Sequence, residues 1–381
     1  MPLKLRNISA SSLNFTNFPV NIPLREYDNS IETIFKDLSK RGILHSIYTW
    51  GSVANPGISD LDLLVVLKDN AKLPLKYKSI YFMGNKSRYI VVHPFMVANK
   101  NSAQNARIIY PDTKFKKVFG EDIKLKAPKK SQLYALRACL LNDIIIRHLP
   151  RDFISILKSQ KINVREILLR LKSMAYSIRL YNLVTGKHIE KSELYEKKIY
   201  ELRKNWFEID KKEQENSILK LFKDAFRASI NIVDSFNSYL EYNKIAEIDK
   251  KIDEISYSGE KNKTIFIRDW SKSDGLDSGD NIKLPINLAA QLLCYSSQNG
   301  DLSRYIANNL LPKTLKYQFK NALIAEKRIS ILNAQAALAE KMGHLHFPAF
   351  FDFGYRPEKG IFNKIYLNVR KMRKKSFVLK N

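Results

Sequence analysis

Acidic residues and cysteines are scarce in this chain. Its 381 residues include 38 aspartates and glutamates against 65 lysines and arginines, which gives a formal net charge of +27. The two cysteines, Cys139 and Cys294, lie in apolar helical patterns and read as small hydrophobic residues. Two cysteines alone exclude a disulfide framework and a cysteine-built zinc site.

Long apolar runs are also missing. No stretch approaches the ~18 uninterrupted apolar residues that a membrane-spanning helix needs. Residues Met1 to Asn7 are basic, but no apolar segment follows them as a signal peptide would require. The chain is 45% hydrophobic, so it can form a sizeable core, and its length is enough for two or three domains. We therefore expect a soluble, cytoplasmic protein without a membrane span.

The excess of positive charge has two readings. It favours a polyanionic partner such as nucleic acid, a nucleotide, an acidic glycan or a membrane surface. An A/T-rich genome, which favours lysine codons, would spread the same excess evenly and give it less meaning. The C-terminal segment from Arg356 to Asn381 holds nine basic residues and one acidic residue. It is either a solvated tail or an electrostatic contact to nucleic acid or another anion.

One motif stands out from the rest of the chain. Gly51-Ser52 follows an apolar segment, and Asp60-Leu61-Asp62 comes seven residues later, at the start of a second apolar run. On a strand, residues two apart lie on the same face, so both carboxylates would lie together. Two such charges repel unless a cation lies between them, and Mg²⁺ binds one or two carboxylates plus phosphate oxygens. A glycine lets the backbone approach a ligand closely, and a serine offers a hydroxyl and an N–H to a phosphate.

This stretch resembles the signature of the DNA polymerase β-like nucleotidyltransferase superfamily. It is most similar to the small nucleotidyltransferases of the aminoglycoside-modifying and antitoxin types. The resemblance covers about the first 125 residues and is strongest over residues 48–67. The alternative is a hairpin with an Asn-Pro-Gly loop, in which Asp60 is a turn residue and Asp62 is solvated.

The resemblance implies an α+β fold, with a small palm of mixed sheet and flanking helices followed by an α-helical bundle. It also implies that Asp60 and Asp62 are catalytic metal ligands for Mg²⁺ or Mn²⁺. Gly51, Ser52 and Ser59 would bind the nucleoside triphosphate, ATP or another, that serves as substrate. Basic residues from the bundle would complete the phosphate site, and the candidates are Arg137, Arg147, Lys172 and Arg179.

The chain departs from the family at one point. The superfamily usually carries a third carboxylate on a later strand, but the matching segment, Tyr89 to Val97, has no acidic residue. His93 is the ionisable group near its centre, and an imidazole has a pKa suited to accepting the proton of an acceptor hydroxyl. His93 is therefore a candidate catalytic base, or else a packed histidine without a role. Asp112 lies far downstream, in a turn.

The apolar periodicity divides the chain into four parts. Helix is expected over residues 28–42, and strands over 43–50, 61–67, 79–83 and 88–97. Residues 118–124 resemble the loop that closes the domain in aminoglycoside-type enzymes, or form an ordinary turn. The expected domains are a palm at 1–127, a helical bundle at 128–250, a linker or loop at 251–284 and a helical C-terminal region with a basic tail at 285–381.

Three apolar stripes support the helical bundle. Their members are Leu133, Leu136, Leu140 and Ile144, then Val164, Ile167, Leu168, Leu171, Ala175 and Ile178, then Ile218, Phe222, Ala225, Phe226, Ile230, Val233 and Phe236. Thr185-Gly186-Lys187 is typical of a helix end. His344, His346 and Asp352 have no further ligand at a diagnostic spacing, which argues against a metal site there.

Two functions follow as hypotheses. In the first, the chain is an enzyme that transfers a nucleoside monophosphate from an NTP to a hydroxyl of a small molecule, a protein or an RNA end. In the second, the palm is catalytically degenerate and binds a nucleotide, nucleic acid or a protein partner. The Asp pair favours the first hypothesis, and the missing third carboxylate favours the second.

Overall fold

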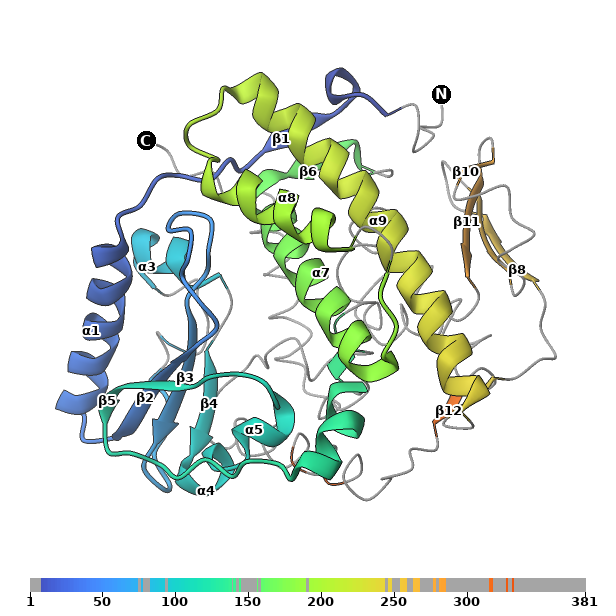
Figure 1. Ribbon diagram of the computed structural model, residues 1–381. Helices are drawn as coiled ribbons and strands as arrows, with labels where there is room; N and C mark the ends of the chain where they lie inside the picture. The colour runs from blue at the N-terminus through green and yellow to red at the C-terminus, as the bar shows by residue number, and fades with distance from the viewer. Residues whose placement is uncertain are drawn as a thin grey trace. The chain divides into compact units, whose positions relative to one another are not determined.

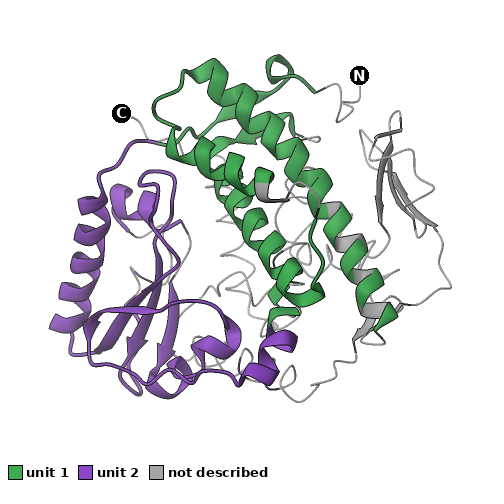
Figure 2. Ribbon diagram, viewed as in Figure 1, with its two compact units in different colours: residues 1–19, 137–322 green, residues 20–136, 323–381 purple. Residues whose placement is uncertain are grey.

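The protein is an α+β chain with a mixed sheet and several helices (Figure 1). The computed structural model describes residues 8–74, 77, 83–92, 95–138, 140–141, 144, 156, 159–189, 192–243, 246–248, 254–258, 263–267, 277–278, 281–285, 315–317, 327 and 331. Residues 20–136 and 323–381 form one compact unit, and residues 1–19 and 137–322 form the other (Figure 2). Within these described ranges, no helix is long and apolar enough to cross a membrane.

The unit that contains residues 20–136 is built on a four-stranded sheet with the order β4-β3-β2-β5. Its strands are β2 (Leu44–Trp50), β3 (Asp62–Leu67), β4 (Met96–Asn99) and β5 (Lys116–Gly120). Strand β2 pairs antiparallel with β3 and with β5, whereas β3 and β4 run parallel. The sheet is therefore mixed, and β5 is an edge strand.

Helix α1 (Leu24–Lys40) covers one face of this sheet (Figure 1). Its apolar side chains recur at helical spacing, and Ile31, Ile34 and Leu38 are buried in one cluster with the sheet. The helix ends before Gly42, whose φ of +65° is a conformation that glycine adopts without steric cost. The helix expected over residues 28–42 is confirmed, although it begins four residues earlier.

Strand β3 is apolar on both faces. Leu61, Leu63, Val65 and Leu67 pack in the cluster with α1. Because side chains alternate along a strand, Asp62, Leu64 and Val66 lie on the opposite face. Leu64 and Val66 are fully buried there. The strands expected at 43–50 and 61–67 are confirmed, and the alternation places Asp62 on the face that α1 does not cover.

The segment after β3 differs from expectation. Residues expected to form a strand at 88–97 include helix α3 (Asn85–Ile90) and only the first part of β4. Helix α3 buries Tyr89 and Ile90, so tertiary burial overrides the strand propensity of this run. Two short helices follow β4, namely α4 (Lys100–Ala103) and α5 (Ala106–Ile109).

The expected closing loop at 118–124 is also wrong in part. Residues 118–120 belong to strand β5. A bulge between Ile47 and Tyr48 shifts the register, so Ile47 pairs with Phe119 and Tyr48 pairs with Lys117. Phe119 therefore faces α1, where it stacks on Phe35 with ring centroids 4.0 Å apart.

The unit of residues 1–19 and 137–322 contains three long helices in its described ranges, and a pair of short strands precedes them. Strand β1 (Asn14–Thr16) runs parallel to β6 (Lys161–Asn163), after the short 3-10 helix η2 (Ala10–Ser12). The helices are α7 (Val164–Thr185), α8 (Ser192–Lys204) and α9 (Lys211–Tyr242). Residues 8–19 thus group with this bundle, whereas the sequence analysis assigned residues 1–127 to a single palm domain.

The ends and the core of the bundle follow the sequence. The Asn163 side chain accepts a hydrogen bond from the Glu166 N–H, which caps α7. Gly186, with a φ of +67°, ends α7 and donates to the Asn182 carbonyl at 2.9 Å, as expected for a helix end. The apolar stripe expected on α7 is buried in full. On α9, its described members are buried as well: Ile218, Phe222, Ala225, Phe226 and Phe236.

The expected loop at 251–284 contains strands. These are β8 (Glu254–Ser258), β9 (Lys263–Ile267), β10 (Asp277–Ser278) and β11 (Asn281–Pro285), joined in one sheet. Polar residues alternate with apolar ones in Glu-Ile-Ser-Tyr-Ser, which is a strand period that the glycines and serines nearby obscured. Strand β12 (Leu315–Tyr317) pairs with β7 (Ala246–Ile248) inside a segment expected to be helical.

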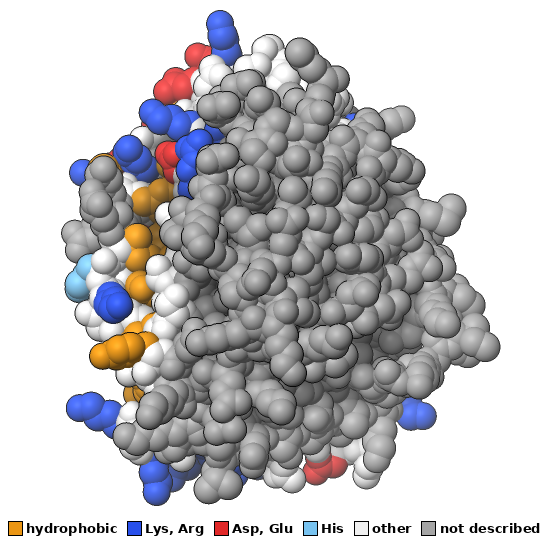
Figure 3. All heavy atoms as spheres, turned by 90° about the vertical axis from the view of Figure 1, so that its right-hand side faces the viewer, with side chains coloured by type: hydrophobic (Ala, Val, Ile, Leu, Met, Phe, Trp, Pro, Cys, Tyr) orange, Lys and Arg blue, Asp and Glu red, His pale blue; other side chains and the backbone are white. Residues whose placement is uncertain are grey.

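Several expectations fall outside the described residues. They concern His93, Cys139, Arg147, Cys294, His344, His346, Asp352, the side chains of Ile230 and Val233, residues 79–82, and most of the helical C-terminal region with its basic tail expected at 285–381. On the face drawn in Figure 3, Lys and Arg side chains recur in the strip of described residues. This distribution matches the charge excess of the whole chain.

Candidate functional site

The Gly-Ser motif lies where β2 ends and the loop to β3 begins. Gly51 has a φ of +77° and Gly57 has a φ of +84°, so the loop turns at two positions that glycine adopts without steric cost. Between them, the Asn55 carbonyl accepts hydrogen bonds from the N–H groups of Ile58 and Ser59 at 3.1 and 2.7 Å. The loop is therefore a defined turn with its own hydrogen bonds.

Two buried tyrosines hold this loop in place. The Tyr27 hydroxyl, from α1, donates to the Ser59 carbonyl at 2.6 Å and accepts from the Gly57 N–H at 2.9 Å. The Tyr89 hydroxyl, from α3, donates to the Gly57 carbonyl at 2.8 Å and accepts from the Val20 N–H at 2.8 Å. Both polar groups of Gly57 are thus bound inside the protein. Neither tyrosine was predicted from the sequence to belong to the site, because a tyrosine among apolar residues looks like an ordinary core residue.

Ser59 faces into the loop. Its residue surface is fully buried, and its Oγ accepts a hydrogen bond from the Asn55 N–H at 3.3 Å. The backbone of Ser59 contributes to the same turn through the bonds to Asn55 and Tyr27. Ser52, by contrast, is exposed, as is Gly51. Of the three residues expected to bind nucleotide, Gly51 and Ser52 thus lie at the surface.

The carboxylate of Asp62 lies beside Gly51. Asp62 is the first residue of β3 and pairs with Trp50 across the antiparallel ladder. A Cβ atom built on Gly51 would come within 3.1 Å of the Asp62 Oδ2. The φ of Gly51 favours glycine at this position, and a side chain there would also crowd the Asp62 carboxylate. The first and last members of the motif are brought together by strand pairing.

Asp60 and Asp62 flank a buried leucine. Leu61 donates its N–H to the Ile90 carbonyl at 3.0 Å and packs with α1. Asp60 and Asp62 are both partly buried, so neither is an open surface residue. The alternation around Leu61 predicts that both carboxylates lie on the side away from α1. Carboxylates in such a position are the hard oxygen ligands that Mg²⁺ prefers.

Aromatic residues line the same face of the sheet. Trp50, opposite Asp62, contacts Tyr110 with ring centroids 4.4 Å apart and Phe115 with centroids 6.1 Å apart. Trp50 and Phe115 are partly buried, and Tyr110 is buried. In the sequence, the signal for this aromatic face is the alternation of Tyr48 and Trp50 at the end of β2.

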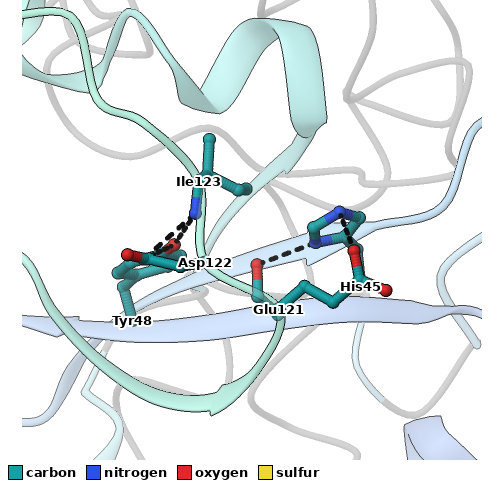
Figure 4. A network of polar contacts seen from close by, with 6 residues as sticks. His45, Tyr48, Glu121, Asp122 and Ile123 are labelled. Atoms are coloured by element: carbon teal, nitrogen blue, oxygen red, sulfur yellow. Dashed lines mark hydrogen bonds and ion pairs between the residues drawn. The ribbon is translucent and has the colours of Figure 1, made fainter.

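The next residue on this face is Tyr48, which joins β2 to the segment after β5. Its hydroxyl donates to the Asp122 Oδ1 at 2.9 Å and accepts from the Ile123 N–H at 2.6 Å (Figure 4). Burial and the hydrogen bond to Asp122 raise the pKa of Tyr48 to about 12. Beside it, the His45 Nε2 lies 3.4 Å from the Glu121 Oε2.

The other described strands of this sheet offer no third carboxylate. Strands β2, β4 and β5 contain no Asp or Glu. Asp112 is exposed in the turn after α5. Among described side chains, no group of three or more His, Cys, Asp or Glu residues has a metal-binding arrangement.

The candidate basic residues of the bundle belong to the other compact unit. Arg179 forms an ion pair with Glu196 at 3.0 Å and a hydrogen bond with the Tyr200 hydroxyl at 2.7 Å. It thus joins α7 to α8.

Comparisons with protein-family models, with curated proteins and with solved structures found no match to this chain.

Proposed function

We propose that residues 20–136 form a nucleotidyltransferase palm, and that the chain transfers a nucleoside monophosphate from an NTP to a hydroxyl group. The observation that carries this proposal is the position of the Asp62 carboxylate against the Gly51 turn. A loop that begins with a glycine and an exposed serine, and that leads into a pair of aspartates with the Asp62 carboxylate beside the glycine, suits a phosphate chain with its divalent cation.

Each residue of the site then has a task. The exposed N–H groups and hydroxyl at Gly51 and Ser52 hold phosphate oxygens, and Ser59 positions the loop. Asp60 and Asp62 hold Mg²⁺ or Mn²⁺, which when bound neutralises charge on the phosphates. The acceptor oxygen bonds to the α-phosphorus, the bond to the β-phosphate oxygen breaks, and pyrophosphate leaves. The acceptor proton passes to a base, for which His93 is the candidate.

The test is incubation of the chain with labelled NTPs and Mg²⁺ or Mn²⁺, followed by measurement of pyrophosphate release. Asp62→Asn should lower the rate about 100-fold or more, because it removes a charge that acts on the transition state. Asp69→Asn is the matched control, since Asp69 is exposed beyond the opposite end of β3. Equal turnover of the two variants would remove Asp62 from the mechanism.

A second candidate function is nucleotide binding without transfer. It is favoured by the absence of acidic residues from β2, β4 and β5, because the family's third carboxylate lies on a strand of this sheet. Under this hypothesis, an NTP with Mg²⁺ binds the wild-type chain and binds Asp62→Asn more weakly, but no pyrophosphate appears with either. Nucleotide binding that is absent in the wild-type chain would contradict both functions.

A further inference from the structure

Positive charge is concentrated in one described segment. Residues 114–130 contain seven lysines and two acidic residues, a net charge of +5 over 17 positions. The preceding 94 residues of the same unit, 20–113, contain 12 basic and eight acidic residues, a net charge of +4. A lysine excess that came from codon usage alone would be spread evenly, so this concentration needs a local cause.

All seven lysines are exposed. They are Lys114, Lys116, Lys117, Lys124, Lys126, Lys129 and Lys130. Within the described part of the chain, no ion pair involves any of them. We name this set, together with Trp50 and Phe115, the β5 surface.

The two acidic residues of the segment are held toward β2. Glu121 lies 3.4 Å from His45, and Asp122 accepts the hydrogen bond of Tyr48 (Figure 4). Since each acidic side chain has a partner on β2, neither needs a lysine of the segment. The lysines of residues 114–130 can therefore bind an external anion.

Protection of the sheet edge does not account for this charge. Lysines on an edge strand do prevent unwanted strand pairing. Only Lys116 and Lys117 lie on β5, however, and Lys124, Lys126 and Lys129 lie beyond its end. The lysines continue along the chain beyond the end of β5. Edge protection does not need lysines there, whereas binding of a long polyanion would use them.

Aromatic rings stand at one end of this charged segment. The register of β2 and β5 pairs Thr49 with Lys116, so Trp50 and Phe115 come next to each other at the same end of the sheet. Their centroids are 6.1 Å apart with an interplanar angle of 22°. Lys117 pairs with Tyr48, which lies on the same face of β2 as Trp50 because the two residues are two apart on that strand.

We propose that the β5 surface binds single-stranded nucleic acid, with phosphates along the lysines and unpaired bases against Phe115 and Trp50. Grooves that bind single strands combine such a lysine-lined path with aromatic rings, because every base has a face that stacks. A duplex keeps its bases stacked on each other and cannot use the rings. This inference goes beyond nucleotide transfer, and it holds with or without that activity.

The experiment measures binding of a fluorescein-labelled 15-nucleotide oligouridylate to the full chain, without NTP, by anisotropy at several salt concentrations. The triple variant Lys114→Gln, Lys116→Gln, Lys117→Gln should bind about tenfold more weakly and should lower the salt slope by about 2. The control triple, Lys40→Gln, Lys68→Gln, Lys72→Gln, removes three exposed lysines elsewhere in the unit and should leave both values unchanged.

A second variant separates stacking from charge. Phe115→Leu should weaken oligouridylate binding about tenfold with an unchanged salt slope, because it removes a ring and no charge. Wild-type chain should bind the single strand more tightly than a blunt RNA duplex of the same length. Equal effects of the two lysine triples, a wild-type affinity in Phe115→Leu, or equal affinity for the duplex or for heparin would overturn the proposal.

Discussion

The carboxylate of Asp62 lies close to the space that a side chain at position 51 would enter. A Cβ atom on Gly51 would lie 3.1 Å from the Asp62 Oδ2. The two residues lie eleven positions apart in the chain. One turn and the pairing of Trp50 with Asp62 bring them together. Gly51 and the Asp62 carboxylate are therefore coupled, and a substitution at either residue should change the conformation of the other.

Gly51→Ala tests this relationship against Gly42→Ala. Both glycines have positive φ, but nothing lies within 4 Å of a Cβ built on Gly42. We expect Gly42→Ala to cost about 1 kcal/mol of stability from its backbone conformation alone. Gly51→Ala should cost more and should abolish pyrophosphate release or nucleotide binding, because the new methyl group displaces the carboxylate.

The measurement is urea unfolding of both variants, together with the nucleotide assay. If Gly51→Ala and Gly42→Ala lost the same stability, and if both kept nucleotide binding, the contact with Asp62 would have no consequence. The double variant Gly51→Ala, Asp62→Ala serves as a check. Part of the lost stability should return when the carboxylate is absent.

Removing the Tyr27 or Tyr89 hydroxyl should loosen the loop. Tyr89→Phe leaves the Gly57 carbonyl and the Val20 N–H without their partner, and Tyr27→Phe does the same to the Ser59 carbonyl. A buried polar group without a hydrogen bond costs about 1–3 kcal/mol. Each variant should lose about that much in urea unfolding.

These two losses should not add, because both hydroxyls bind Gly57. Tyr242→Phe is the control, since Tyr242 is 87% exposed, and it should leave stability unchanged. A loss as large in the control as in the buried positions would argue against a role for the hydroxyls in holding the loop.

The raised pKa of Tyr48 predicts a loss of stability at alkaline pH. The pKa of Tyr48 is about 12 in the folded protein, above the value near 10 of an exposed tyrosine. The native state therefore keeps this proton when the unfolded chain releases it. The resulting stability is fully present below pH 10 and is lost as pH rises from 10 to 12.

Stability curves of the wild-type chain and Tyr48→Phe test this assignment. Over that pH window, the wild-type chain should lose up to about 2–3 kcal/mol more than Tyr48→Phe, at 1.36 kcal/mol for each pKa unit. Tyr77 and Tyr195 also have raised pKa values through burial, and they remain in both proteins. Parallel curves for the two proteins would mean that Tyr48 does not contribute.

Arg203 joins α8 to α7 inside the helical bundle. Its side chain is 1% exposed, and its Nη1 donates to the Leu168 carbonyl at 2.7 Å. Arg203→Ala removes this bond and leaves space between the helices, so we expect a loss of about 2–4 kcal/mol in urea unfolding. The control is Arg227→Ala, because Arg227 is half-exposed and its ion pair with Asp224 is weak at 3.7 Å. That variant should lose less than 1 kcal/mol.

Periodic segments were predicted well from the sequence. Helix α1, strands β2 and β3, and the buried stripe of α7 follow local patterns of apolar residues, because burial of one face repeats with the period of the element. The prediction failed at 88–97 and in parts of 251–284. At 88–97, burial of Tyr89 and Ile90 decided the outcome against the local strand pattern. In 251–284, a local strand period was present, but the glycines and serines around it obscured it.

The sequence by itself determined the motif, the face of Asp62 and the charge of the chain, because these depend on residue type and on spacing along a strand. Only the tertiary structure decided that the Asp62 carboxylate lies beside Gly51 and that Tyr27 and Tyr89 fix the loop between them. Those contacts join residues from α1, α3 and two strands. No local pattern encodes them, since they form only when the sheet assembles and buries the hydroxyl groups.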